Sequence, residues 1–232
     1  MGVANHEMTA LIFDLDGTIV DPREGIVRCM RETVELMGAD PRVLADPERL
    51  IGPPLQEVFA TLLDDASKVD QAVTLFRERY GADGLFEAHL YPGMVDALET
   101  LRHGHARMFV ATSKPREYAV RIVEHFHLTR FFSHVYGSEM SGERADKAHL
   151  LIHLLSRENL AAADAVMIGD RKHDIIAARA NGLRSVAVTW GFGSMEELSA
   201  AGACSFCSSA ADLVHCLAGS LAQTAPTMSA PE

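Results

Sequence analysis

Two aspartates follow the first apolar segment of the sequence. Asp14 and Asp16 belong to residues 14–18 (DLDGT), directly after the apolar residues 11–13. At the carboxyl end of a parallel strand, both side chains would project to the edge of the sheet where open α/β folds bind ligands. Two carboxylates so close together are costly unless a cation or a shared proton compensates. The next glycine permits a sharp turn, and Thr18 offers a hydroxyl and an amide to an anion. Taken alone, the segment fits an ordinary acidic turn equally well.

A second acidic pair follows another apolar segment. Asp170 comes after the apolar residues 165–168 and Gly169, and Asp174 opens the next expected helix. A patch of carboxylate oxygens at a strand end and a helix start suits Mg²⁺. Asp170 as a turn residue and Asp174 as a helix cap are the plainer interpretation, which is compatible with a role in the same site.

Two further positions suggest anion binding. Residues 112–115 (TSKP) end an apolar segment just before an expected helix, so Ser113, Lys114 and the nearby amides can form an anion site. Lys147 follows Asp146 at the start of another expected helix. The helix dipole disfavours a lysine there, so its position is better explained if a phosphate or carboxylates face it.

A parallel sheet would bring these candidates together. Short continuous apolar segments are typical of strands that helices cover on both faces, and helix-length segments separate them. This alternation predicts a doubly wound, Rossmann-like α/β sheet. The expected strands are residues 9–13, 107–111, 134–136, 165–168, 184–188 and, as a sixth, 204–207; the expected helices are residues 95–102, 116–126, 147–156 and 175–181.

Residues 21–90 interrupt the alternation. Helical patterns recur across them on both sides of the Gly- and Pro-containing residues 51–55 (IGPPL), and we expect no strand there. The segment is too long for an ordinary crossover connection. We therefore predict a helical cap at residues 21–90, inserted into an α/β core of residues 1–20 and 91–222, and a disordered tail at residues 223–232.

The composition excludes several classes of protein. Of the 232 residues, 48% are hydrophobic and 23% are charged, as in ordinary globular proteins. The net charge of −11 disfavours a nucleic acid polymer or an anionic membrane as partner. We find no signal peptide and no segment of the about 20 apolar residues that span a membrane. The four cysteines do not form a secreted disulfide pattern, and we expect no role for Cys204 and Cys207. These features predict a cytoplasmic protein and leave its oligomeric state open.

In this order, the motifs resemble those of the haloacid dehalogenase superfamily of phosphotransferases. Residues 14–18 match its first motif, Ser113 the second, Lys147 the third, and Gly169-Asp170 with Asp174 the fourth. The helical insert after the first motif is similar to the helical cap of the family. Residues 51–55, 112–115 and 169–174 look most like the phosphoglycolate phosphatase branch, which also contains 5′-nucleotidases.

The resemblance implies roles for the acidic residues. Asp14 would be the nucleophile that forms an aspartyl-phosphate, and Asp16 the general acid and then the general base. Mg²⁺ would bind the Asp14 carboxylate, the Asp16 backbone carbonyl and Asp170. Asp174 would hold a metal-bound water or orient Lys147.

The resemblance also implies residues that bind the substrate. Ser113 and Lys147 would bind the phosphoryl oxygens, with Thr18 and Lys114 as further phosphate-binding candidates. The substrate is expected to be a small phosphorylated metabolite. Candidates to face its leaving group are Arg23, Gly52 and Pro53 in the cap and Arg116 and Arg171 beside the phosphate motifs.

We therefore expect a Mg²⁺-dependent phosphatase that acts on a small, phosphoglycolate-type monoester. Asp16 favours ester hydrolysis, since the resemblance implies that dehalogenase members lack a carboxylate there. A 5′-nucleotidase, a sugar-phosphate phosphatase and a phosphomutase remain alternatives. A phosphoacceptor signalling domain is disfavoured by the helical insert at residues 21–90. Dinucleotide binding is disfavoured because no G-x-G-x-x-G follows the first strand. The filled motif positions do not support an inactive binding protein.

Overall fold

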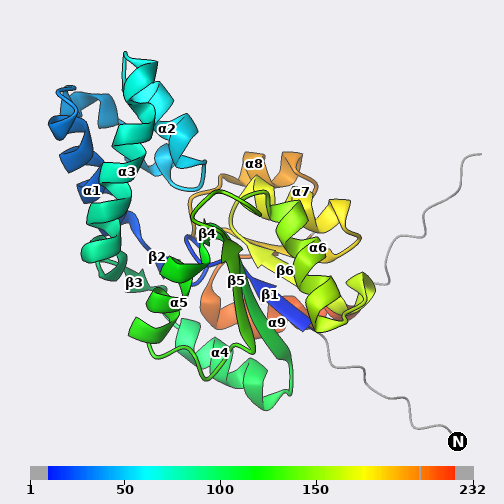
Figure 1. Cartoon of the computed structure of the whole chain (residues 1–232). Coiled ribbons are helices and arrows are strands. Elements are labelled where there is room, and N and C mark those ends of the chain that lie inside the picture. Colours follow the sequence, from blue (N-terminus) through cyan, green and yellow to red (C-terminus); the bar gives the residue numbers. More distant parts are fainter. Residues whose placement is uncertain (1–9, 204, 223–232) are drawn as a thin grey trace, which may run out of the picture.

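The core of the protein is a six-stranded parallel sheet. The computed structural model describes residues 10–203 and 205–222 (Figure 1). The strand order is β5-β4-β1-β6-β7-β8, and all neighbouring strands run parallel. The predicted α/β sheet is thereby confirmed. Its strands are β1 (Ala10–Phe13), β4 (Arg107–Pro115), β5 (His134–Ser138), β6 (Ala165–Gly169), β7 (Arg184–Val188) and β8 (Phe206–Cys207).

Strand β1 is the point at which the strand order reverses. The chain first adds β4 and β5 on one side of β1, then crosses over and adds β6, β7 and β8 on the other side. Doubly wound folds bind their ligands at the carboxyl edge of the sheet beside such a reversal. Asp14 stands at this reversal, directly after β1.

Alternate side chains of the strands pack into two apolar clusters, one on each face of the sheet. Leu11 and Phe13 pack into one apolar cluster with helices of one face, and Ala10 and Ile12 pack into another on the opposite face. Because both faces are covered, the central strands β1 and β6 are continuously apolar. Helices α4 (Met94–His103), α5 (Arg116–His125) and α9 (Leu213–Ala222) cover the first face; α6 (Lys147–Glu158) and α7 (Lys172–Ala180) cover the second, with α8 (Met195–Ala200) beside α7.

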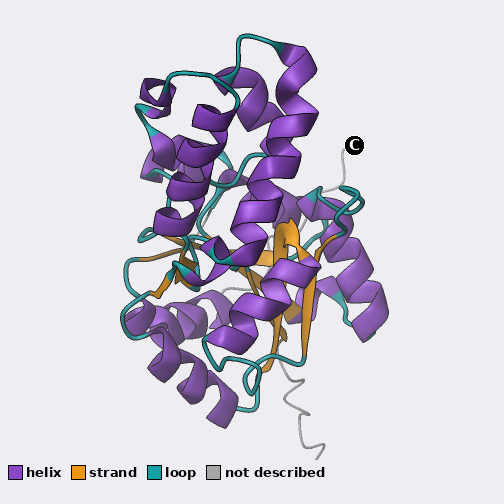
Figure 2. Ribbon diagram, turned by 60° about the vertical axis from the view of Figure 1, so that its left-hand side comes forward, coloured by secondary structure: helices purple, strands orange, loops and turns teal. Residues whose placement is uncertain are grey.

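A separate group of helices stands beside the sheet, as Figures 1 and 2 show. These helices pack on one another through apolar side chains such as Val34, Phe59 and Phe76. The group comprises α1 (Arg23–Leu36), α2 (Leu55–Leu62) and α3 (Val69–Ala82), with 3-10 turns at Pro41–Leu44, Pro47–Leu50, Ala66–Lys68 and Gly84–Phe86. We refer to residues 21–90 as the cap.

The expectation that residues 21–90 contain no strand is wrong at both ends. Strand β2 (Val20–Asp21) pairs antiparallel with β3 (His89–Leu90) where the chain enters and leaves the cap. Strands of two residues are too short to show a sequence period, and their pairing depends on the cap bringing distant segments together. Helix α7 also begins at Lys172, three residues before the predicted helix, and α8 and α9 lie outside the predicted elements.

Two predictions concern residues outside the described part of the chain, namely the tail at residues 223–232 and Cys204. Cys207 lies in β8, as expected for the sixth strand. Within residues 10–203 and 205–222, no helix combines the length and the apolar character needed to cross a membrane.

Candidate active site

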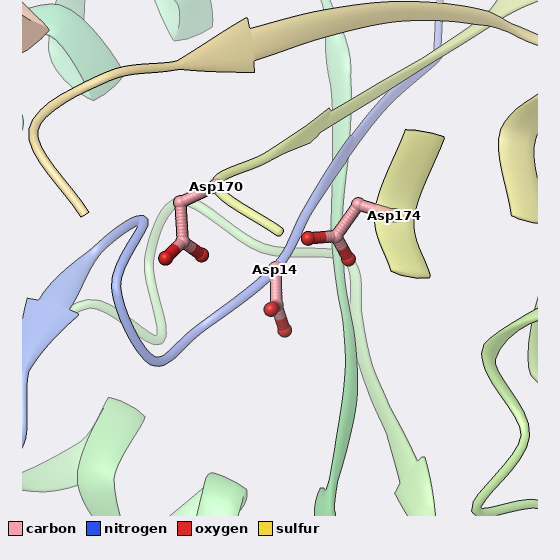
Figure 3. A group of neighbouring side chains, drawn as sticks. All are labelled: Asp14, Asp170 and Asp174. Carbon is pink, nitrogen blue, oxygen red and sulfur yellow. The ribbon is translucent and has the colours of Figure 1, made fainter. Parts of the chain in front are cut away.

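Three aspartates from separate elements converge at the edge of the sheet (Figure 3). Asp14 follows β1, Asp170 follows β6, and Asp174 lies in the first turn of α7. Each offers one carboxylate oxygen, and these oxygens all lie within 4.8 Å of one another. All three residues are buried, with Asp14 9% exposed and Asp170 fully enclosed. A buried cluster of three carboxylates requires positive charge to compensate it.

Strand register and small residues make this convergence possible. Phe13 lies opposite Ile168, so the residues that follow β1 and β6 leave the sheet together. The Asp14 amide donates to the Ile168 carbonyl oxygen at 2.9 Å. Gly17 has a φ of +80°, and a Cβ there would lie 2.2 Å from Asp170 Oδ2. Only glycine therefore provides both the turn and the space for the Asp170 carboxylate.

Lys147 supplies part of the compensating charge. Its Nζ lies 2.8 Å from Asp14 Oδ1 and 2.9 Å from Asp174 Oδ1, and it donates to the Ala111 carbonyl oxygen at 2.9 Å. Burial lowers the pKa of Lys147, but the carboxylates of Asp14 and Asp174 outweigh burial and raise this pKa above its ordinary value. The lysine is therefore held as a cation between two of the three aspartates.

Asp170 is compensated mainly by dipoles. Its Oδ1 accepts a hydrogen bond from Thr18 Oγ1 at 3.2 Å, and its Oδ2 accepts one from the Phe192 amide at 2.8 Å. Burial raises the pKa of Asp170 well above its ordinary value, and the charges of Asp174 and Asp14 add to this effect. Burial also raises the pKa of Asp174, to about 6, although Lys147 opposes it. One lysine thus faces three buried carboxylates, and a divalent metal with a preference for oxygen ligands fits this donor set.

Asp16 binds a core lysine that also contacts the cap. Both of its carboxylate oxygens lie 2.8 Å from Lys114 Nζ, which also lies 2.6 Å from the Tyr80 hydroxyl of α3. Burial raises the pKa of Asp16, whereas Lys114 lowers it, and the net shift is upward. The two carboxylates of residues 14–18 therefore have different surroundings, as an acid–base pair with separate roles requires.

The comparisons with known proteins agree with this geometry. The sequence model described as haloacid dehalogenase-like hydrolase matches residues 11–188. The chain belongs to this family. A solved structure of a predicted phosphatase from Clostridium acetobutylicum superposes with a TM-score of 0.86 at 33% identity, covering 92% of this chain and 100% of the other. The predicted family, fold class and enzyme class are confirmed.

Among curated relatives of this haloacid dehalogenase-like chain, the names differ. A 5′-nucleotidase from Pseudomonas aeruginosa is 43% identical, covering 88% of this chain and 92% of that protein. A phosphoglycolate phosphatase from Aliivibrio fischeri is 30% identical, with coverages of 84% and 89%. A tyrosine-protein kinase PtkA from Mycobacterium tuberculosis is 34% identical, covering 79% of this chain but only 62% of the kinase.

The remaining phosphate-binding candidates of this family member are Ser113, Thr18 and Lys114. The Ala111 carbonyl of β4 contacts Lys147 Nζ, and Ser113 follows two residues further along the same strand. The Ser113 carbonyl accepts a hydrogen bond from Ser138 Oγ at 2.9 Å. The structure places the Thr18 hydroxyl on Asp170 and the Lys114 ammonium on Asp16, so both side chains support carboxylates. A phosphate-binding role for Thr18 and Lys114 stays a prediction.

The leaving-group candidates are divided between the cap and the core. Arg23 is half exposed, pairs with Glu48 at 3.2 Å and lies 5.4 Å over the Phe192 ring. Arg116 is exposed, and its Nε donates to the Val135 carbonyl at 3.1 Å, which holds it along the edge of β5. Arg23 thus contacts the ring of a residue whose amide binds Asp170. Gly52 and Pro53 follow Ile51, whose carbonyl binds Arg171.

Residues 189–193 (TWGFG) belong to the site of this hydrolase, although no prediction included them. The Phe192 amide binds Asp170, and Trp190 Nε1 donates to the Thr18 carbonyl at 3.0 Å. A Cβ at Gly191 would lie 2.4 Å from Asp170 Oδ2. The sequence contains a signal for this loop, because Gly191 and Gly193 flank Phe192 shortly after the strand expected at residues 184–188. Tyr80 has no comparable signal, since it lies within a helical pattern.

Proposed function

We propose that the protein is a Mg²⁺-dependent phosphatase that hydrolyses a small phosphate monoester through an aspartyl-phosphate on Asp14. The observation that carries this proposal is the contact of Lys147 with Asp14 inside a buried carboxylate cluster, with Asp16 held apart by Lys114. A lysine beside a nucleophilic carboxylate can attract the transferring phosphoryl group without blocking attack. When bound by Asp14, Asp170 and the Asp16 carbonyl, with Asp174 holding a bound water or orienting Lys147, Mg²⁺ would supply the positive charge that the four acidic groups and a phosphate require.

The first step breaks the ester. An oxygen of Asp14 attacks phosphorus, a carboxylate–phosphorus bond forms, and the bond from phosphorus to the ester oxygen breaks. Asp16 gives its proton to that oxygen, so the alcohol leaves neutral. The upward pKa shift of Asp16, caused by burial, supports a protonated acid in this step. Ser113 and Lys147 hold the other phosphoryl oxygens.

The second step restores the enzyme. Asp16, now ionised, takes a proton from a water molecule whose oxygen attacks phosphorus. The bond between phosphorus and Asp14 breaks, inorganic phosphate leaves, and Asp16 is again protonated. Lys114 stabilises the ionised form of Asp16 between the two steps, which its position 2.8 Å from both carboxylate oxygens supports.

Two substrate classes follow from the comparisons. A phosphoglycolate-type small ester is one, and a nucleoside 5′-monophosphate is the other. The higher identity to the relative named 5′-nucleotidase, 43% against 30%, favours the nucleotide. The Arg23 guanidinium over the Phe192 ring, on the cap side of Asp170, supplies a cationic and aromatic surface suited to a nucleoside.

The test begins with para-nitrophenyl phosphate and Mg²⁺, followed by phosphoglycolate, adenosine and uridine 5′-monophosphates and glucose 6-phosphate. We expect hydrolysis that EDTA removes and Mg²⁺ restores, and the highest kcat/KM for a nucleoside monophosphate. Asp14→Asn should abolish turnover and the labelled phosphoenzyme. Metal-independent hydrolysis, or full activity of Asp14→Asn, would contradict the proposed mechanism.

A further inference from the structure

The side chain of Arg171 joins the core to the cap. Its Nη1 donates to the Ile51 carbonyl oxygen at 2.5 Å, across a sequence separation of 120 residues. Ile51 is only 2% exposed and begins residues 51–54, which connect a 3-10 turn to α2. We call residues 51–54 the cap loop. Arg171 directly follows Asp170 in the sequence. Adjacent residues therefore belong to the carboxylate cluster and to a contact with the cap.

Glu197 of α8 holds the guanidinium from the core side. Its Oε1 lies 2.9 Å from Arg171 Nε, and its Oε2 lies 3.5 Å from Nη2. The Lys172 amide donates to the same Oε1 at 2.9 Å, which anchors the carboxylate to the start of α7. The side chains of Arg171 and Glu197 are 14% and 22% exposed, so water screens their ion pair only partly. This arrangement leaves Nη1 directed at the cap loop.

The backbone of the cap loop is shaped around this contact. Gly52 has a φ of +110°, a conformation that side-chain-bearing residues rarely adopt. A Cβ at Gly52 would lie 2.8 Å from Arg171 Nη1. Glycine therefore permits both the turn of the loop and its close approach to the guanidinium. The contact involves the backbone of Ile51, so it sets the position of the loop independently of the Ile51 side chain.

Arg171 is also tied to the carboxylate cluster through its backbone. Its amide donates to Asp174 Oδ2 at 3.1 Å, while Lys147 binds the other oxygen of Asp174. The guanidinium was a candidate to face the leaving group, but in the structure it contacts Glu197 and Ile51. These contacts suit a group that places other residues better than one that binds substrate directly.

We propose that Arg171, held by Glu197, is a positioning residue that fixes the cap loop over the active site and thereby shapes the surface that meets the leaving group. The proposal rests on the proposed phosphatase function, because it assigns the cap loop to that substrate site. It predicts that loss of the guanidinium frees the loop and weakens substrate binding, while the carboxylates that perform the reaction remain in place.

The test compares Arg171→Ala and Glu197→Gln with Lys172→Ala, which removes a neighbouring exposed cation but keeps the Lys172 amide. Hydrogen exchange of the peptide spanning residues 48–56 is measured in the Mg²⁺-loaded full chain without substrate. We expect exchange about tenfold faster in Arg171→Ala, a smaller increase in Glu197→Gln and no change in the control. With para-nitrophenyl phosphate, KM should rise about tenfold in Arg171→Ala, with kcat within about twofold of wild type.

Unchanged exchange at residues 48–56 in Arg171→Ala would overturn the proposal, as would a fall in kcat at constant KM. If Arg171→Ala does not fold, Gly52→Ala disturbs the same contact from the cap side. It should raise both exchange and KM, and wild-type behaviour of that variant would also overturn the proposal. Absence of hydrolysis by the wild-type protein would instead refute the proposed function, because the exchange measurement does not require turnover.

Discussion

Lys114 Nζ lies 2.8 Å from both carboxylate oxygens of Asp16, and the Tyr80 hydroxyl of the cap lies 2.6 Å from the same nitrogen. This contact connects the proposed general acid to a core lysine and a cap tyrosine. Lys114 favours the ionised form of Asp16 and so lowers its pKa, although burial keeps the net shift upward. The lysine therefore sets a balance between the acid and base roles of Asp16.

The first prediction concerns Lys114→Met. Removal of the cation should raise the pKa of Asp16, because the effect that lowers it is lost. The first step needs protonated Asp16, so the alkaline limb of the kcat/KM profile should move to higher pH. Turnover should fall about tenfold or more, since ionised Asp16 loses its partner in the second step. Steady-state assays between pH 5 and 9, roughly the range of ordinary buffers, measure both effects.

Tyr80→Phe is the matched control for Lys114→Met. It keeps the ring in the cap and removes only the hydroxyl, so Lys114 remains on Asp16. The alkaline limb should then move little. A limb that moves as far in Tyr80→Phe as in Lys114→Met would show that the tyrosine, and not the lysine, controls Asp16.

The second prediction concerns Lys147→Met. This change leaves Asp14 and Asp174 buried without their cation, which should destabilise the metal-free protein by about 3 kcal/mol. Mg²⁺ should recover part of that loss, because it compensates the same carboxylates. Activity should fall by about 10² or more, as for loss of a group that stabilises phosphoryl charge. Thermal unfolding with and without Mg²⁺ checks the stability effect; no destabilisation would show that the three short contacts of Lys147 contribute little.

The third prediction concerns pH and metal. The pKa values of Asp170 and Asp174 are raised in the folded protein, the latter to about 6. A carboxyl group with a raised pKa binds its proton more tightly folded than unfolded. Stability of the metal-free protein should therefore fall as pH rises from the ordinary aspartate pKa, about 4, through these raised values.

In the proposed site Mg²⁺ would bind the ionised carboxylates. Because the pKa of Asp174 is raised to about 6, the increase in Tm caused by Mg²⁺ should be small near pH 5 and larger near pH 7.5. Calorimetry at the two pH values tests this. Asp170→Asn should remove most of the Mg²⁺-dependent increase. An increase of the same size at both pH values would indicate that the metal binds elsewhere.

The fourth prediction uses two glycines with positive φ. Gly17→Ala and Gly142→Ala both introduce a side chain into the left-handed region, at φ of +80° and +90°. The new Cβ of Gly17→Ala would lie 2.2 Å from Asp170 Oδ2, whereas Gly142 has no atom within 4 Å of its Cβ position. Both should lose about 1 kcal/mol of stability from the backbone, and only Gly17→Ala should lose activity and Mg²⁺ affinity. Equal activity in the two variants would argue against displacement of Asp170.

Local sequence patterns were sufficient to predict the six-stranded sheet and the acidic residues that gather at its edge. Continuous apolar segments such as residues 165–168 form buried strands because a covered parallel sheet leaves them no polar face. A strand then delivers the next residues to its carboxyl edge, so Asp14, Ser113 and Asp170 could be assigned to one edge before any contact was known. The turn at Gly17 was predictable as well, because this glycine directly follows the acidic residues at the end of the strand.

The partners of those residues depend on the tertiary structure. Lys114 lies between Asp16 and Tyr80 because α3 packs on the core, which no local pattern describes. Arg171 likewise reaches Ile51 because α8 brings Glu197 beside it. The sequence by itself determined which chemical groups stand at the edge of the sheet, because strand formation is a local property. Only the folded chain decided which charges neutralise each other, because short-range contacts between distant segments exist only after packing.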